Sequence, residues 1–257
     1  MINAKDSHNT FYVLDKKKDM PIVFIHGVGL NHKIWEPQIN VFENTFIAYD
    51  ILGHGKTPLN KENISFDDFS IQLINLIDEL KIDKIHLVGF SIGSLIARNF
   101  ASKYSDRLES LILLCSIFKR TEKQKQIVKD RFQLAKKSKS LSKQALKRWF
   151  TDDYLEKNPN TYIKISSILE QNNMENFLKV YELFVNHEDN EKFENIKTKT
   201  LVMTGEGDVG STPEMSESLS KLIDNSKVKI ISKGKHLCSI ECADDVNMSI
   251  KKHIQNG

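Results

Sequence analysis

The chain has 257 residues, of which 40% are hydrophobic and 28% are charged, and its formal net charge is +3. These values are typical of globular proteins and exclude a disordered or fibrous chain, and the length suits one large α/β domain with or without an insertion. The first residues lack a signal-peptide pattern and no apolar run approaches the roughly 18 residues that span a bilayer, so we expect a cytoplasmic protein without membrane contact.

Seven short apolar runs separated by helical patterns predict a doubly wound, mostly parallel α/β sheet with helices on both faces. The clearest helix is predicted over residues 66–80, because apolar residues recur there at helical spacing and Ser65 with Asp68 matches a capping box. A last helix is predicted from about Ala243. In chain order, the predicted strands cover residues 10–14, 22–26, 45–49, 84–88, 110–115, 200–204 and 228–231.

Residues 116–196 interrupt this alternation with helical patterns alone. We therefore predict a core formed by residues 1–115 and 197–257 and an all-helical cap formed by the interruption. An insertion between two core strands is expected to lie over the carboxyl ends of the sheet, where α/β proteins bind ligands. The helical patterns of the predicted cap cover residues 142–150, 161–171 and 174–186, with a break at Pro159.

Charge is unevenly distributed within the predicted cap. Residues 119–148 contain twelve basic and two acidic residues, whereas residues 149–196 contain ten acidic and four basic ones, an arrangement that favours pairing in the folded chain. Nucleic-acid binding is one interpretation of the basic run, but no stacking aromatics or recognition motif accompany it. We expect a solvated lysine-rich face and no nucleic-acid partner, with an anionic substrate or an acidic carrier protein as the ligands that such a face would attract.

The pentapeptide Gly89-Phe90-Ser91-Ile92-Gly93 lies between a predicted strand and a predicted helix. This is the context of a nucleophile elbow, in which small residues on either side let a serine hydroxyl stand clear of a sharp turn. Ser91 is therefore a candidate nucleophile. Because a serine hydroxyl needs a base to take its proton and a carboxylate to orient that base, the chain should supply a histidine and an acid as well.

A candidate acid and a candidate base follow the last two predicted strands. Asp208 lies in the loop after the first of these strands and Glu206 is its rival there, whereas Asp224 falls in a later turn. His236 lies in the loop after the last strand. The chain order Ser91, Asp208, His236 is the order of the triad in enzymes that carry a nucleophile elbow.

Two backbone amides are candidates for an oxyanion hole, which stabilises the negative oxygen of an acyl-transfer intermediate. The amide of Ile92 directly follows the candidate nucleophile at a helix N-terminus, where the helix dipole adds to the effect. The amide of Val28 lies in a glycine-containing turn after an early strand. An ordinary glycine turn is the alternative interpretation of this second segment.

Five ordered motifs make the chain resemble the α/β-hydrolase fold family over essentially its whole length. The motifs are His26-Gly27-Val28-Gly29, Asp50-Ile51-Leu52-Gly53-His54-Gly55, Gly89-Phe90-Ser91-Ile92-Gly93, Gly205-Glu206-Gly207-Asp208 and Gly234-Lys235-His236. The resemblance implies that the second motif is a structural loop, so His54 is assigned no catalytic role. Some relatives carry their acid after the preceding core strand, and the absence of a carboxylate at 114–116 favours Asp208.

The resemblance also narrows the chemistry, because Ser91 stands where haloalkane dehalogenases and epoxide hydrolases carry an aspartate. Local matches such as Trp35-Glu36-Pro37-Gln38 and Arg148-Trp149-Phe150-Thr151 are similar to 3-oxoadipate enol-lactonases, and the segment 26–35 is similar to carboxylesterases. The predicted function is a serine hydrolase that cleaves a small carboxylic ester or lactone through an acyl-enzyme. A cofactor-free C–C bond hydrolase or lyase and a non-catalytic small-molecule-binding protein are the alternatives.

The substrate pocket is expected to involve aromatic side chains, with Trp35, Phe90 and Trp149 as candidates, although core packing accounts equally well for each. We expect no metal and no organic cofactor. The cysteines lack paired metal-ligand spacing, so buried thiols are favoured over a zinc site near His236.

Overall fold

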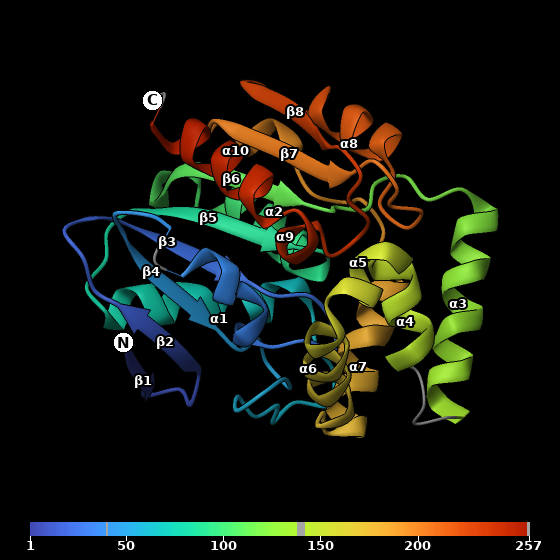
Figure 1. Ribbon diagram of the computed structural model, residues 1–257. Helices are drawn as coiled ribbons and strands as arrows, with labels where there is room; N and C mark the ends of the chain where they lie inside the picture. The colour runs from blue at the N-terminus through green and yellow to red at the C-terminus, as the bar shows by residue number, and fades with distance from the viewer. Residues whose placement is uncertain (40, 138–141, 256–257) are drawn as a thin grey trace.

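An eight-stranded sheet forms the centre of the protein (Figure 1). The computed structural model describes residues 1–39, 41–137 and 142–255. Strands β3 to β8 run parallel to one another, β2 pairs antiparallel with β4, and β1 pairs antiparallel with β2 at the edge. The strands are ordered β1-β2-β4-β3-β5-β6-β7-β8 and comprise β1 Ile2–Lys5, β2 Phe11–Asp15, β3 Asp19–Ile25, β4 Asn44–Tyr49, β5 Ile85–Phe90, β6 Leu108–Leu114, β7 Thr200–Gly205 and β8 Ser226–Ile231.

The doubly wound, mostly parallel architecture expected from the sequence is confirmed, and each of the seven predicted strands is found with shifted ends. Strand β1 was not predicted. Its sequence, INAK, has no apolar run, and only Ala4 is partly buried when the segment pairs with β2 at the edge of the sheet. An edge strand of this kind leaves no pattern of alternating burial to recognise.

Helices cover both faces of the sheet, and each face has its own apolar core. Helices α1 (Phe66–Glu79), α2 (Ile92–Lys103) and α8 (Pro213–Ser220) contribute to one core. The short helix η1 (His32–Gln38), α9 (Cys238–Glu241) and α10 (Ala243–Gln255) contribute to the other. The predicted capping box at the start of α1 is present, since the Asp68 carboxylate accepts hydrogen bonds from the Ser65 amide and hydroxyl.

In the described residues, five α-helices and the short helix η3 (Phe193–Asn195) lie between β6 and β7, and the α-helices stand beside the carboxyl ends of the parallel strands (Figure 1). Apolar residues of α4 and α6, Leu146 and Ile165 among them, join the core on the α10 side of the sheet. The division of the chain at residues 116 and 196 stays a prediction. The inserted helices are α3 Glu122–Lys137, α4 Ser142–Trp149, α5 Asp152–Lys157, α6 Pro159–Glu170 and α7 Met174–Val185.

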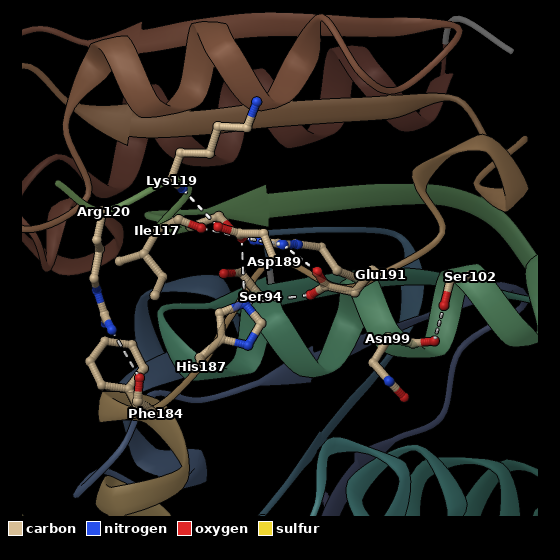
Figure 2. Close-up of polar contacts among 12 residues, drawn as sticks. Ser94, Asn99, Ser102, Ile117, Lys119, Arg120, Phe184, His187, Asp189 and Glu191 are labelled. Carbon is tan, nitrogen blue, oxygen red and sulfur yellow. Dashed lines mark hydrogen bonds and ion pairs between the residues drawn. The ribbon is translucent and has the colours of Figure 1, made fainter. Parts of the chain in front are cut away.

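Both ends of the insertion are tied to α2 through Arg98, whose side chain is fully buried. Its guanidinium donates hydrogen bonds to the Ile117 carbonyl, where the insertion begins, and to the carboxylates of Asp189 and Glu191, where it ends. The Lys119 amide donates to the second oxygen of Asp189 (Figure 2). The start and the end of the insertion are thereby held against the helix that begins at the candidate nucleophile.

No helix in the described residues combines the length and the apolarity that a crossing of the bilayer requires.

Candidate active site

The candidate nucleophile lies on a sharp turn between β5 and α2. Ser91 adopts a φ of 56°, in the left-handed region that non-glycine residues rarely occupy. A Cβ atom on Gly89 would lie 2.2 Å from the Gly93 carbonyl oxygen, and one on Gly93 would lie 2.4 Å from the Ile25 carbonyl oxygen. The glycines are therefore required because the turn brings backbone against backbone on both sides of the serine.

The structure brings Ser91, Asp208 and His236 together. The Nε2 atom of His236 lies 3.2 Å from the Ser91 hydroxyl, and its Nδ1 atom lies 2.6 Å from an Asp208 carboxylate oxygen. The other oxygen of Asp208 accepts hydrogen bonds from the amides of Gly210 and Ser211, at 2.8 and 3.0 Å. The loop after β7 thus fixes the acid, and the acid fixes the imidazole ring.

The charges of the imidazole and the carboxylate stabilise each other. Burial acts against a charged imidazole, but the Asp208 carboxylate outweighs it and raises the pKa of His236 above its ordinary value. Burial would raise the pKa of Asp208, yet the charge and hydrogen bond of His236 hold that pKa below its ordinary value. The pair therefore favours the imidazolium form, which is the form a histidine takes when it accepts a proton from serine.

The rival acids lie elsewhere. Glu206 is exposed and accepts hydrogen bonds from the Ser232 hydroxyl and the Lys233 amide. Asp224 is an exposed partner of Lys197. Of the acids considered from the sequence, Asp208 alone contacts His236 in the described part of the chain.

The two candidate oxyanion-hole residues lie at the same site as the serine. Val28 lines the same cavity as Ser91, and Ile92 is the first residue of α2. Within the described residues, neither backbone amide donates a hydrogen bond to another protein group. Two free amides near a serine hydroxyl are what stabilisation of an oxyanion requires.

Two buried histidines hold the turn that contains Val28. The Gly29 amide donates to Nε2 of His54 at 2.8 Å, and the Ile51 amide donates to Nε2 of His26 at 3.0 Å. Neither ring contacts the Ser91 hydroxyl among the described contacts, in line with the structural role that the sequence motif implied for His54. The chain thus uses two neutral imidazoles to position the backbone of the candidate oxyanion hole.

A cavity formed by the insertion and the core opens onto Ser91 and His236. Trp149 lines it, with its ring 6.2 Å from the His236 ring. Trp35 and Phe90 do not line it: both are fully buried in the core, where their rings pack edge to face at 6.4 Å. Trp35 lies in η1 with its ring 5.0 Å from the ring of Phe24 on β3, and Phe90 ends β5 with its ring 4.9 Å from the His236 ring. Their role as pocket residues stays a prediction.

The basic segment divides into two groups that the sequence did not separate. Its described lysines are mostly exposed, whereas Arg120, Arg131 and Arg148 are half-buried and line the cavity. The expected solvated face therefore describes the lysines and is wrong for the arginines. The signal available in the sequence was residue type, since arginine is more weakly hydrated than lysine and is preferred where charge is buried.

Two clusters of described side chains contain enough donors to bind a metal: Cys115 with Asp208 and His236, and His187 with Asp189 and Glu191. In the first, the imidazole and the carboxylate bind each other, and the Cys115 thiol donates to the His236 carbonyl. In the second, the guanidinium of Arg98 already neutralises both carboxylates at 2.7 Å. Neither arrangement favours an added cation.

Comparison with known proteins places residues 20–242 within the pattern of the alpha/beta hydrolase fold. Over 253 residues the chain is 26% identical to an (E)-2-((N-methylformamido)methylene)succinate hydrolase of Acinetobacter baylyi, covering 97% of this chain and 95% of the relative. It is 24% identical to 3-oxoadipate enol-lactonase 2 of the same organism, covering 93% and 91%.

Solved structures show the same fold. The enol-lactonase of Burkholderia xenovorans LB400 superposes with a TM-score of 0.89 at 22% identity, covering 99% of this chain and all of the other. A thermophilic esterase of Thermogutta terrifontis superposes with a TM-score of 0.86 at 21% identity, covering 100% and 99%.

Proposed function

Because this chain belongs to the alpha/beta hydrolase fold family, we propose that it is a serine hydrolase that cleaves a carboxylic ester or lactone through an acyl-enzyme. The observation that carries the proposal is the continuous hydrogen-bonded chain from the Ser91 hydroxyl through His236 to Asp208, with distances of 3.2 and 2.6 Å. The two relatives that match nearly the whole chain are both hydrolases, one of a succinate derivative and one of an enol-lactone.

The geometry supports a two-step acyl transfer. In its neutral form, His236 takes the proton of Ser91 as the serine oxygen attacks the substrate carbonyl, and Asp208 stabilises the resulting imidazolium. The amides of Val28 and Ile92 donate to the oxyanion. His236 then gives its proton to the leaving oxygen, and the acyl group remains on Ser91.

Water completes the reaction. His236 removes a proton from a water molecule that attacks the acyl-enzyme, a second oxyanion forms at the same amides, and the proton passes to the departing serine oxygen. The free acid leaves and the enzyme returns to its starting state. A lactone follows the same steps, except that its leaving oxygen stays attached to the acyl chain.

The test uses a fluorophosphonate probe, which phosphonylates an activated serine, together with hydrolysis of a panel of short and long esters and lactones. We expect labelling of the native protein, its loss in Ser91→Ala, and full labelling of Ser232→Ala, an exposed serine in the loop that precedes His236. Native protein that is not labelled would contradict the proposal. Labelling without hydrolysis of any ester or lactone would instead favour C–C bond hydrolysis by the same residues.

A further inference from the structure

Three arginines of the insertion line the cavity that opens onto the candidate nucleophile. Arg120 precedes α3, Arg131 lies within α3 and Arg148 lies within α4. Burial raises the pKa of Tyr181 on α7, and the positive charges of all three guanidinium groups oppose that rise. Three positive charges therefore converge on one pocket from three separate positions in the chain.

Arg120 has spare capacity to donate hydrogen bonds. One of its terminal nitrogens donates to the Phe184 carbonyl at 3.0 Å (Figure 2) and to the Val185 carbonyl at 3.3 Å. The guanidinium also lies 4.4 Å from the centre of the Phe184 ring. Its other terminal nitrogen is buried and has no partner in the described structure. These contacts fix the plane of the guanidinium and leave one donor edge free.

The other two arginines also lack an acidic partner. Arg148 donates to the Gln144 carbonyl at 2.8 Å. Among the described residues, the arginines that form ion pairs within 4.0 Å are Arg98 and Arg107, and the three pocket arginines are absent from these pairs. The charge of Asp189 partly counters the lowering of the Arg120 pKa. The two Asp189 oxygens already accept hydrogen bonds from Arg98 and from the Lys119 amide.

The concentration of positive charge in this pocket is costly. Burial lowers the pKa of Arg120 to about 10, and it also lowers the pKa of Arg148, with repulsion from Arg131 adding to both shifts. Partly buried charges without counterions are unfavourable unless a ligand compensates them. An anionic ligand would relieve both the desolvation and the mutual repulsion.

From this arrangement we infer, on the basis of the proposed function, that the substrate is an ester or lactone of a polycarboxylic acid, with at least two free carboxylates held by Arg120, Arg131 and Arg148. Guanidinium groups bind carboxylates through paired hydrogen bonds. The rest of the lining includes Val128, Leu169 and Phe177, which suits a hydrocarbon segment between the carboxylates and the scissile carbonyl.

The positions of the three arginines argue against an acidic carrier protein as the ligand that they bind. A carrier would contact the exposed lysines on the outer side of α3, such as Lys129, whereas the arginines face the cavity. A small polyanion can reach Ser91 and the arginines at once. The two ligands therefore depend on different side chains, and on α3 itself Lys129 and Arg131 distinguish them.

Isothermal titration tests this inference without turnover. Native protein is titrated at low salt with tricarballylate, butyrate and inorganic phosphate, and the titration is repeated with Arg131→Gln, Arg148→Gln and Lys129→Gln. We expect tricarballylate to bind at least about tenfold more tightly than butyrate, and each arginine substitution to weaken it about tenfold, as expected for a lost charge-assisted hydrogen bond. Lys129→Gln removes the same charge from the outer side of α3 and should leave binding unchanged.

Three results would overturn the inference: equal binding of tricarballylate and butyrate, equal losses in Lys129→Gln and Arg131→Gln, or phosphate binding more tightly than tricarballylate. Circular dichroism of each variant establishes that it is folded, and Arg131→Lys should recover part of the affinity. Fluorophosphonate labelling is measured on the same samples. A protein that is labelled but does not bind tricarballylate refutes this inference alone, whereas binding without labelling refutes the serine mechanism.

Discussion

Acid should destabilise this fold through His26 and His54, which the structure keeps neutral. In each ring, Nε2 accepts a hydrogen bond from a backbone amide, and Nδ1 lies within hydrogen-bond distance of a backbone carbonyl, that of Gly27 or Leu52. Because a backbone amide can only donate, a proton on Nε2 would break these bonds. Burial is the largest cause of the shifts that lower the pKa of His26 to about 4 and of His54 to about 3.

The magnitude follows from linkage. An unfolded histidine has a pKa of about 6.5, so below that pH the unfolded chain binds protons that the folded chain does not. Stability therefore falls as the pH falls from about 6.5 towards the folded pKa. Between about pH 7 and about pH 5, each such histidine removes about 2 kcal/mol from the free energy of unfolding. His236, which is paired with Asp208, acts in the opposite direction over this pH range. Its pKa is raised in the folded state, so the folded chain binds this proton more tightly than the unfolded chain does.

The assay is urea unfolding of native protein, His54→Gln and His8→Gln at several pH values in this range. A glutamine oxygen can still accept from the Gly29 amide but cannot be protonated. On acidification, we expect the free energy of unfolding of His54→Gln to fall by about 2 kcal/mol less than that of native protein. Each variant is compared with itself at two pH values, so its stability at neutral pH does not affect the result. His8 is exposed, and its variant should follow the native curve. Parallel curves for native protein and His54→Gln would refute the reasoning.

Three further predictions follow from the site and its supports. Asp208→Asn should reduce kcat by roughly 10⁴-fold and move the midpoint of the pH–rate profile to lower pH, since an amide cannot raise the pKa of His236; an unmoved midpoint would contradict the pairing. Gly89→Ala should abolish fluorophosphonate labelling and cost about 1–3 kcal/mol in urea unfolding, whereas Gly207→Ala, whose added Cβ would meet no atom closer than 3.3 Å, should change neither. Arg98→Met should cost about 3–5 kcal/mol by leaving two carboxylates without their cation, and a loss under about 1 kcal/mol would show that the network is not stabilising.

The nucleophile turn was predictable because its requirements are local. A strand, a small residue on each side of a serine and a helix follow one another within a dozen positions, and the backbone contacts at Gly89 and Gly93 exclude any larger residue. The acid and the base were predictable for a related reason. Each lies in the loop after a parallel strand, and the carboxyl ends of parallel strands meet at one edge of a sheet.

The pocket was less predictable because its residues depend on packing between distant segments. An aromatic residue in the sequence shows only that a large apolar surface must be buried. Trp35 buries its ring against the sheet, whereas Trp149 buries part of its ring in the cavity. The Trp149 carbonyl also accepts a hydrogen bond from the amide of Leu237, the residue after His236. Nothing in the composition of the two segments separates these outcomes.

By itself the sequence determined the fold class, the turn that carries Ser91 and the acid and base that follow later strands, because these depend on periodicity and on chain order. Only the tertiary structure decided which way the basic segment faces. One α3 surface carries lysines into solvent and another carries Arg131 into the cavity, where Arg120 and Arg148 meet it from neighbouring segments. The physical reason is that the direction of a side chain is set by what its helix packs against, here α7, and that contact joins residues far apart in the chain.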